Sequence, residues 1–399
     1  MTLSKSCNNP INPTIIRRRI LILSLEFNYS SFSGNGVLSR SIGSSLARRD
    51  DCTVRVICAK PHPATPDISN DIDMTIIDNV DICPVELPRQ CKWKRLDKEG
   101  PWYEFATNAC NFVNNVKDYQ PTDVIAVDWH GMIAWRAICD RLLAEFHTTN
   151  GNDSVTSSSS WHPTNVKVCY YNFRVYSNSD YADDKSFYKE KEQLSCHHHI
   201  SNVVICLSEH DRSLLQKLID DDADNESLSK QKIHILYPPL RGDIYNLAMN
   251  MDQSNISSSL PHEVKSVIEK VSTVETKYTN KRMLITCMAR LSPEKSSHHF
   301  VTLLQKLGGV EFLKKYTLIP ILCGAISDEE YANKVINDFK ALCSAGGEAW
   351  PCIAITRHLG PENLAAVFSS TVINVHVSCL YCVSFFIEMF LCLKLTLLP

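Results

Sequence analysis

Residues 283–295 of the chain read MLITCMARLSPEK, and this stretch decides the fold prediction. The apolar run Met283–Met288 has the length and composition of a buried strand. It is followed by Arg290 and, five positions later, by Lys295, and the pattern of Ser297–Leu307 predicts a helix. Arg offers a planar fork of donors, Lys a compact charge and a helix start unpaired N–H groups, so the turn can bind a diphosphate. Taken alone, the spacing also fits an exposed turn with ordinary charged residues.

The rest of the chain repeats this alternation in two blocks. In the second block, we expect further strands at Tyr316–Cys323, Cys352–Thr356 and Val372–Val377, and helices at Glu329–Cys343 and Glu362–Ser369. In the first block, we expect strands at Ile20–Leu25, Val54–Ala59, Asp123–Val127, Val166–Tyr171, Asn202–Leu207 and Ile233–Leu236, and helices at Val37–Arg48, Trp102–Val116 and Met132–Phe146. Strands that alternate with helices predict an α/β fold with two Rossmann-like, doubly wound domains that face a cleft.

The composition suggests where these domains begin and end. We predict an N-terminal tail at 1–17, a first domain at 18–265, a linker at 266–282, a second domain at 283–378 and an apolar tail at 379–399. Three polar segments read as surface insertions, because they bury too little apolar surface to order themselves: Thr148–Ser160, Asp220–Lys230 and Asn250–Pro261.

The overall composition is that of an ordinary globular protein. The chain has 399 residues, of which 44% are apolar and 21% charged, which argues against global disorder. The net charge of −3 provides no field that attracts nucleic acid or anionic lipid, so neither is an expected partner. Most of the 17 cysteines lie inside apolar runs, where we expect them to be small buried hydrophobes in a reducing compartment. The apolar run after Arg17–Arg19 is too short for a signal peptide, so we expect a cytoplasmic protein, with a plastid left open.

Six short segments occur in the order in which the glycosyltransferases of family 4 carry their motifs. They are Ser33–Val37, Asp128–Gly131, Val203–Ser208, Ala289–Lys295, Ile321–Gly324 and Leu359–Leu364. Over residues 18–378 the chain therefore resembles this family, which includes glycogen and starch synthases. The resemblance implies the GT-B fold and the transfer of a hexose from a UDP-, ADP- or GDP-hexose to a carbohydrate or related acceptor. It also implies retention at the anomeric carbon, with no separate cofactor and no metal.

On the donor side, the resemblance assigns roles residue by residue. Arg290 and Lys295 hold the donor phosphates and stabilise the leaving diphosphate, whose negative charge grows in the transition state. Gly34 and Gly36 approach that diphosphate from the first domain, since no Cβ intrudes. The later loops of the donor domain include Gly324, Gly360 and Leu364.

The remaining assignments lie in the first domain. His130 and Asp128 are the candidate catalytic residues, and we expect His130 to project from the loop after its strand. A local hydrogen-bonding role for His130 is the alternative. Three residues that follow another strand are assigned to the acceptor side: Tyr171, Asn172 and Arg174.

The chain differs from the glycogen and starch synthases at two positions. The synthases carry a Lys just ahead of the paired glycines, where this chain has Ser31 or Phe32. They also carry a His before the Asp that corresponds to Asp128, where this chain has Val127. The first departure favours a relative with another acceptor. The second motivates the alternative hypothesis, a non-catalytic or truncated relative that binds a sugar or a partner. An epimerase of the same fold is a third class, but its catalytic carboxylates and histidines cannot be placed.

The C-terminal end differs most from the family pattern. After the strand that corresponds to Val372–Val377, family members continue into a loop with two glutamates that contact the donor. In this chain, Glu388 is the only acidic residue of Cys379–Pro399. We weigh a membrane anchor, which Glu388 and Lys394 would interrupt, an alternative ending that packs on the second sheet, and a gene-model artefact. We favour the artefact and expect an incomplete second domain.

Two further patterns suggest metal sites only at first sight. His197, His198 and His199 are consecutive, so on a helix they point in different directions and cannot converge on one metal. Cys379 and Cys382 have zinc or redox spacing, but no second ligand pair follows them.

Overall fold

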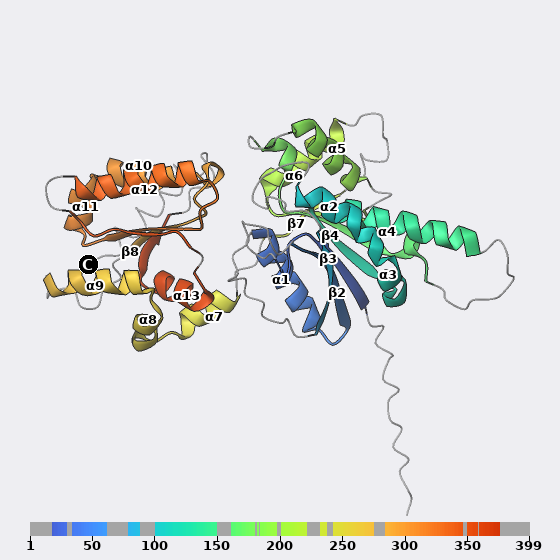
Figure 1. The fold of residues 1–399 in the computed structure, drawn as a ribbon, viewed down its shortest axis with the longest axis horizontal. Coiled ribbons are helices and arrows are strands. Elements are labelled where there is room, and N and C mark those ends of the chain that lie inside the picture. Colours follow the sequence, from blue (N-terminus) through green and yellow to red (C-terminus); the bar gives the residue numbers. More distant parts are fainter. Residues whose placement is uncertain are drawn as a thin grey trace, which may run out of the picture. The chain divides into compact units, whose positions relative to one another are not determined.

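The computed structural model describes residues 18–29, 34–61, 79–87, 100–149, 161–179, 182, 184–197, 201–221, 232–237, 242–274, 284–345, 349–357 and 359–375. The chain divides into two compact units, Met1–Pro238 and Pro239–Pro399. Each unit is a parallel sheet with helices on both faces (Figure 1). The predicted fold class, two doubly wound α/β units, is confirmed.

The sheet of the first unit is parallel throughout. Its strands are β1 (Arg18–Ser24), β2 (Cys52–Lys60), β3 (Val80–Glu86), β4 (Asp123–Val127), β5 (Lys167–Asn172), β6 (Val203–Cys206) and β7 (Ile233–Ile235). Their order is β3-β2-β1-β4-β5-β6-β7. The direction in which successive strands are added reverses between β1 and β4. Open α/β sheets bind ligands at such a switch point, outside the carboxyl ends of the strands.

Alternate residues of β1 explain why helices cover both faces of this sheet. Leu21 and Leu23 enter a core built with α2 to α6, whereas Ile20 and Ile22 enter a core on the side of α1. Burying each such side chain contributes about 1.5–3 kcal/mol. The helices are α1 (Gly34–Ala47), α2 (Pro101–Asn108), α3 (Val113–Tyr119), α4 (Asp128–Thr149), α5 (Lys185–Cys196) and α6 (Glu209–Asp220), with 3₁₀ turns η1 (Ala109–Phe112), η2 (Pro163–Asn165) and η3 (Tyr176–Asn178).

Strand β3 was not expected, because it lies within the polar stretch 61–100 and contains Pro84. Proline cannot donate to a sheet ladder, which argues against a central strand. The structure places β3 at the edge of the sheet, where β2 is its one partner among the described strands, and there a proline is tolerated.

The start of α4 corrects a second prediction. The helix was expected from Met132, with Asp128 and His130 in a preceding loop, but α4 begins at Asp128, directly after β4. Gly131 permits this tight junction, since a Cβ there would lie 2.7 Å from the carbonyl oxygen of Leu23 in β1. The motif residues therefore occupy the first turn of a helix at the switch point.

The second unit repeats the arrangement with four described strands. They are β8 (Leu284–Met288), β9 (Ile319–Cys323), β10 (Ile353–Ile355) and β11 (Thr371–Asn374), in the parallel order β10-β9-β8-β11. The helices are α7 (Gly242–Asn250), α8 (Gln253–Ser259), α9 (His262–Val274), α10 (His298–Lys306), α11 (Gly309–Lys315), α12 (Glu329–Ser344) and α13 (Pro361–Ser369), with a 3₁₀ turn η5 (Pro293–Lys295). Figure 1 shows α10, α11 and α12 on one face of this sheet and α9 and α13 on the other.

The two units divide earlier in the chain than the sequence suggested. The first domain was predicted to reach residue 265, with a linker at 266–282, but α9 belongs to the second unit. Val264 and Val271 of α9 lie in a core with β8, β9 and β10. The side chain of Asn363 in α13 also donates to the carbonyl of Ser259 at the end of α8, with an N–O distance of 2.7 Å. The polar composition of 250–261 led to its prediction as a surface insertion, and composition alone gave no indication of these packing contacts.

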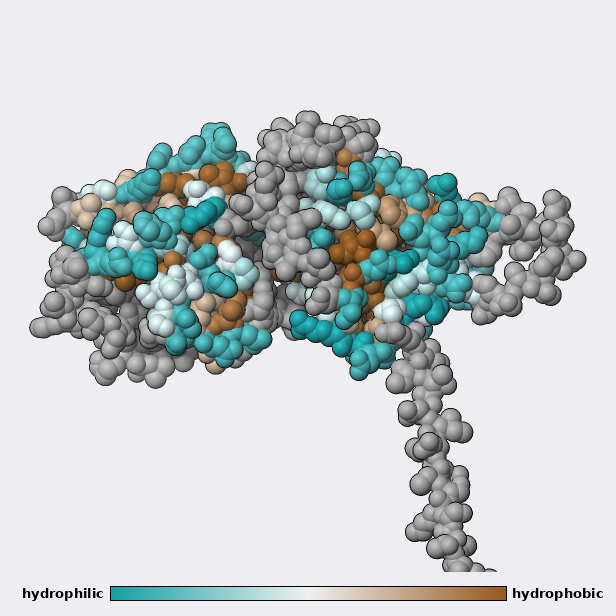
Figure 2. Space-filling view, turned by 60° about the horizontal axis from the view of Figure 1, so that its bottom comes forward, coloured by the Kyte–Doolittle hydropathy of each residue, from teal (hydrophilic) through white to brown (hydrophobic). Residues whose placement is uncertain are grey.

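Several predictions fall outside the described residues. These include the tail at 379–399 with Cys379 and Cys382, the histidines His198 and His199, and most of the predicted insertions Thr148–Ser160 and Asp220–Lys230. Within the part that is described, no helix combines the length and apolar character needed to cross a bilayer. Figure 2 shows hydrophilic residues over much of each unit's visible face, with apolar residues between them.

Candidate functional site

The first candidate site lies at the switch point between β1 and β4, where Asp128 begins α4. Its side chain is fully buried, and its backbone φ is +53°, in the left-handed region that non-glycine residues seldom occupy. Such strain persists only where the surrounding structure enforces it, and it concentrates at functional positions. Asp128 is therefore the first residue of the site to consider.

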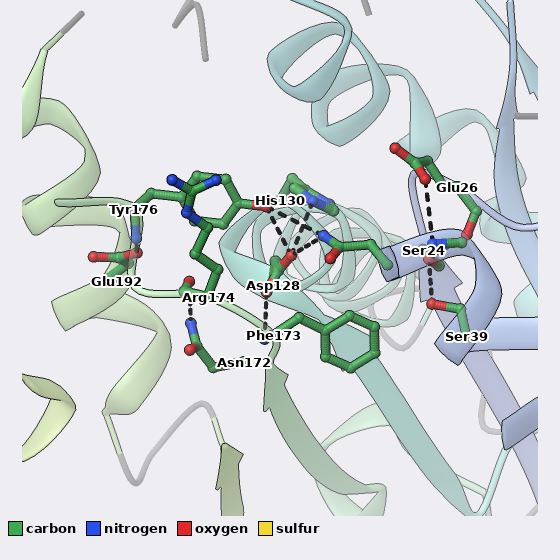
Figure 3. Close-up of polar contacts among 12 residues, drawn as sticks. Ser24, Glu26, Ser39, Asp128, His130, Asn172, Phe173, Arg174, Tyr176 and Glu192 are labelled. Carbon is green, nitrogen blue, oxygen red and sulfur yellow. Dashed lines mark hydrogen bonds and ion pairs between the residues drawn. The ribbon is translucent and has the colours of Figure 1, made fainter. Parts of the chain in front are cut away.

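Three donors from different elements converge on the Asp128 carboxylate (Figure 3). The backbone N–H of Phe173 donates to Oδ1 over 2.7 Å. The side-chain amide of Asn35 and the hydroxyl of Tyr176 donate to Oδ2 over 2.7 and 2.9 Å. Burial raises the pKa of Asp128 to about 7, while hydrogen bonds from Phe173, Tyr176 and the Arg174 backbone, and the charge of Arg174, oppose the shift. A carboxyl group with that pKa can both accept and donate a proton near neutrality.

His130 lies two residues after Asp128 in the first turn of α4 and is almost fully buried. Its Nε2 is 3.9 Å from Oδ2 of Asp128, and neither ring nitrogen has a hydrogen-bond partner among the described residues. Its ring lies 5.4 Å from that of Trp102 and 5.6 Å from that of Trp129. Burial lowers the pKa of His130 to about 3, so its imidazole is neutral at pH 7. The prediction that it projects from a loop is wrong, because α4 starts earlier.

The residues predicted for the acceptor side lie at the end of β5, the neighbour of β4, and they separate into two environments. Tyr171 and Asn172 are the last two residues of the strand, and Arg174 follows it. The amide of Asn172 donates to the Tyr170 hydroxyl over 2.8 Å and to the Arg174 carbonyl over 2.9 Å. The Arg174 guanidinium donates to the Ser179 hydroxyl and lies 5.9 Å from the Tyr176 ring. Asn172 and Arg174 thus lie beside the group formed by Asp128 and its hydrogen-bond donors Asn35, Phe173 and Tyr176 (Figure 3).

Tyr171 lies elsewhere. Its ring packs edge-on against Phe173 at 4.8 Å, in the core on the α1 side of the sheet. Burial raises the pKa of Tyr171 to about 12, so it is uncharged at neutral pH.

The glycine loop opens α1, but an internal carboxylate already uses one of its amides. The N–H of Gly36 donates to Oε2 of Glu26 over 3.2 Å, and Glu26 is only 3% exposed. The hydroxyl of Ser24 donates to the Glu26 carbonyl and lies 3.0 Å from that of Ser39 (Figure 3). The N-terminus of a helix attracts anions, and at the start of α1 the carboxylate of Glu26 is the anion that binds there. A Cβ at Gly34 would have no atom within 4 Å among the described residues, apart from its chain neighbours and its own helix backbone.

The second candidate site lies at the switch point of the other sheet, between β8 and β11. Arg290 follows β8 and Lys295 ends η5, and both side chains are half-buried. The hydroxyl of Ser297, the N-cap of α10, donates to the Arg290 carbonyl over 3.4 Å. Ser292, between the two cations, is buried, and its hydroxyl has no partner within the described chain. The turn thus brings positive charge and a polar hydroxyl to the carboxyl end of β8.

Of the predicted glycines in the donor domain, Gly324 has the strictest requirement. A Cβ there would lie 1.8 Å from the carbonyl oxygen of Ala289, so the loop after β9 can contact the Arg290 turn only because residue 324 has no side chain. Gly360 is the N-cap of α13, and a Cβ there would lie 4.0 Å from Oδ1 of Asn363. The N–H of Leu364 donates to the Gly360 carbonyl over 2.9 Å, as part of the first helical turn.

Sequence reasoning did not assign four residues of the first site: Glu26, Asn35, Tyr176 and Glu192. Asn35 lies inside the glycine loop that the sequence analysis quoted, so that motif was a usable signal. Glu192 lies in α5 and offers no local signal, because its partners in η3 are 15 and 16 residues away.

Within the described ranges, no group of His, Cys, Asp and Glu side chains is arranged to hold a metal ion. His197, the first of the three consecutive histidines, is the C-cap of α5.

Comparison with known proteins supports the fold and leaves the finer assignment open. No protein-family model matches the sequence, and no curated protein matches it. Among solved structures, an E. coli trehalose-6-phosphate protein bound with UDP-2-fluoro glucose aligns with a TM-score of 0.59 and 10% identity, over 90% of this chain and 78% of that one. The UDP-forming α,α-trehalose-phosphate synthase from Burkholderia xenovorans, in complex with glucose-6-phosphate, aligns with a TM-score of 0.56 and 11% identity, over 90% of this chain and 79% of that one. The N-terminal domain of the Candida albicans trehalose-6-phosphate phosphatase aligns with a TM-score of 0.55 and 14% identity, over 92% of this chain and 78% of that one.

At these identities the likeness concerns the fold. The chain has the GT-B type of architecture, with two Rossmann-like units, as the sequence predicted. The assignment to family 4 stays a prediction.

Proposed function

We propose that this protein is a hexosyltransferase that takes its sugar from a nucleoside diphosphate donor. The observation that carries the proposal is the basic turn of Arg290 and Lys295 at the switch point of the second sheet. In sugar transfer the leaving group is a nucleoside diphosphate, and preorganised positive charge stabilises it as it departs. The same turn lies between a parallel strand and the start of α10, which is the usual setting for phosphate groups.

The donor that we propose is a UDP-hexose. Two structures with this fold support that choice, one bound with UDP-2-fluoro glucose and one described as UDP-forming. Arg290 would bind phosphate oxygens through two N–H groups, and Lys295 would add a single charge. The glycines of the first unit have a lesser role in this proposal, since the amide of Gly36 is already bound to Glu26.

The acceptor that we propose is a phosphorylated sugar or a related carbohydrate, bound by the first unit. A structure with the same fold contains glucose-6-phosphate. Asp128 carries a carboxyl group with a pKa of about 7, which suits proton transfer to or from a hydroxyl. Retention at the anomeric carbon follows from the resemblance to family 4 and belongs to the proposal.

Calorimetric titration with UDP and with UDP-glucose tests the donor site directly. We expect binding to the full chain, and a loss of about 100-fold in affinity for Arg290→Ala, because a bidentate charge-assisted contact contributes about 1.5–3 kcal/mol. Lys306→Ala removes an exposed cation from the far end of α10 and should leave affinity unchanged. Equal affinities for wild type, Arg290→Ala and Lys306→Ala would exclude the assigned phosphate site.

One observation favours a second candidate, a non-catalytic relative that binds a sugar or a partner. Val127 is a buried apolar residue at the position where the resemblance places a histidine near the reacting sugar. UDP release in the presence of a panel of sugar phosphates distinguishes the two. Binding of UDP-glucose without acceptor-dependent UDP release supports the non-catalytic alternative.

A further inference from the structure

A buried carboxylate on α5 has no part in the motifs or in the proposed chemistry. Glu192 is fully buried, and burial raises its pKa to about 7. It accepts three hydrogen bonds from the η3 turn, namely from the backbone N–H of Tyr176, the backbone N–H of Ser177 and the hydroxyl of Ser177. An acceptor with this many donors from one short turn fixes the position of that turn.

The same turn carries the hydroxyl that donates to Asp128. Tyr176 therefore connects two buried carboxylates, with its backbone N–H on Glu192 and its side-chain hydroxyl on Asp128 (Figure 3). Its ring is also held in place, since it lies 5.8 Å from the ring of Trp102 and 5.9 Å from that of Tyr188 on α5. The location of the hydroxyl thus depends on where α5 anchors η3.

Removing the Glu192 acceptor would leave the N–H groups of Tyr176 and Ser177 in η3 without their hydrogen-bond acceptor, which is unfavourable for groups shielded from water. The turn would shift to find other partners, and the Tyr176 hydroxyl would shift with it. Asp128 also has contacts with Asn35, Phe173 and Arg174, none of which belongs to η3 or hydrogen-bonds to Glu192 in the described structure.

We propose that Glu192 is a positioning residue that acts through η3 to keep the Tyr176 hydroxyl on Asp128. Its consequence for hexose transfer rests on the proposed function, whereas the structural coupling does not. Glu192 has no contact with the reacting groups in this proposal. It sets the hydrogen bonding, and through it the proton affinity, of the carboxyl group that does.

The two ways in which Glu192 can influence Asp128 have opposite signs. Loss of the Tyr176 hydrogen bond, which stabilises the ionised form, raises the pKa of Asp128. Loss of a neighbouring negative charge lowers it, because like charges disfavour ionisation. Glu192→Gln keeps the size of the side chain but leaves one acceptor oxygen for three donors. Its effect on the Asp128 pKa therefore reports which route operates.

The experiment is a pH titration of the Asp128 carboxyl carbon by NMR, with ¹³C-labelled aspartate and assignment by Asp128→Asn. It compares wild type, Glu192→Gln, Tyr176→Phe and the double variant. We expect Glu192→Gln to raise the Asp128 pKa in the wild-type background and to leave it unchanged or lower it in the Tyr176→Phe background. A lowered pKa in the wild-type background, or the same change in both backgrounds, overturns the proposal.

Two further variants cover folding and specificity. Ser177→Ala removes one of the three hydrogen bonds without changing Glu192, and we expect a smaller rise in the Asp128 pKa. No rise in this gentler variant also contradicts the proposal, even if Glu192→Gln does not fold. Glu190→Gln removes an exposed carboxylate of the same helix that pairs with Lys191, and it should leave Asp128 unchanged.

Kinetics then separate the proposal from the proposed function. If the protein transfers hexose, Glu192→Gln should lower kcat about 10-fold, with an unchanged KM for the donor. If the wild type transfers none, the proposed function fails, while the NMR titration still tests the coupling.

Discussion

The two sheets share a strand order at their switch points but carry side chains of opposite charge there. The first has the order β3-β2-β1-β4 around its switch point, and the second has β10-β9-β8-β11. At the first, the carboxylates of Glu26 and Asp128 are buried, whereas at the second the turn presents Arg290 and Lys295 half-exposed. The fold thus sets where a site forms, and the local side chains set its chemistry.

Burial explains why the two sites differ in detail. A buried carboxylate is tolerated only with donors around it, so Asp128 and Glu26 come with hydrogen bonds from distant segments. Arg290 and Lys295 are only half-buried, so their charges keep part of their exposure to solvent. We therefore expect the first site to be sensitive to internal packing and protonation, and the second to depend chiefly on the shape of its turn.

The largest expected effect concerns that shape. Gly324→Ala would put a Cβ 1.8 Å from the carbonyl oxygen of Ala289 and force the Arg290 turn to move. We expect the second unit to lose at least about 3 kcal/mol, the upper range for overpacking. Hydrogen exchange of amides in residues 284–345, with the first unit as an internal reference, measures the loss.

Gly360→Ala is the matched control in the same unit, since among the described residues, apart from the adjoining ones, the nearest atom to its Cβ would be Asn363 Oδ1 at 4.0 Å. It should change stability by less than about 1 kcal/mol. Equal effects of the two substitutions would contradict the claim that Gly324 is required by a backbone contact.

The second prediction uses the protonation of the first site. Asp128 has a pKa of about 7, above its ordinary 3.8, so between these values the folded state binds more protons and stability falls as pH rises. His130 has a pKa of about 3, below its ordinary 6.5, so its contribution rises with pH between these values. Each slope is at most about 1.4 kcal/mol per pH unit, and the two oppose each other.

Asp128→Asn removes the falling contribution, so stability should rise more steeply with pH between 4 and 6.5 than in wild type. Urea unfolding followed by tryptophan fluorescence measures this, because of the six tryptophans only Trp350 lies in the second unit. Arg290→Ala should leave the slope unchanged, since arginine does not titrate in this range. The same slope for wild type and Asp128→Asn would show that Asp128 does not carry the shifted pKa.

The smallest predicted effect concerns Glu26. Glu26→Gln removes the negative charge at the start of α1 while keeping an oxygen for the Gly36 amide. We expect a loss of about 1 kcal/mol in the first unit, from the weaker bond and the lost interaction with the helix dipole. Glu86→Gln, which breaks an exposed pair with Lys60, should have little effect in the same urea experiment. A larger loss of stability for Glu86→Gln than for Glu26→Gln would contradict the stabilising role that we assign to Glu26 at the start of α1.

The comparison also shows which kinds of residue the sequence located. The glycines of the motifs had identifiable positions, and the structure gives a steric reason for Gly131 and Gly324. The sequence also placed the basic pair of the second unit in a turn after a strand, because that signal is local to one strand and one turn, and the phosphate-binding role of the pair stays a prediction. The environment of Tyr171 was not identified, since the fate of its ring depends on Phe173 and on packing against α1.

By itself the sequence determined the alternation of strands and helices, the doubly wound class and the segments that end at the switch points. These follow from short-range periodicity, which each segment carries alone. Only the tertiary structure decided that α4 starts at Asp128, that β3 is an edge strand and that α9 belongs to the second unit. It also brought Asn35, Phe173 and Tyr176 to Asp128 across 93, 45 and 48 residues of chain. Burial and hydrogen bonding between distant segments arise only when the chain packs, and they set the proton affinity of that carboxyl group.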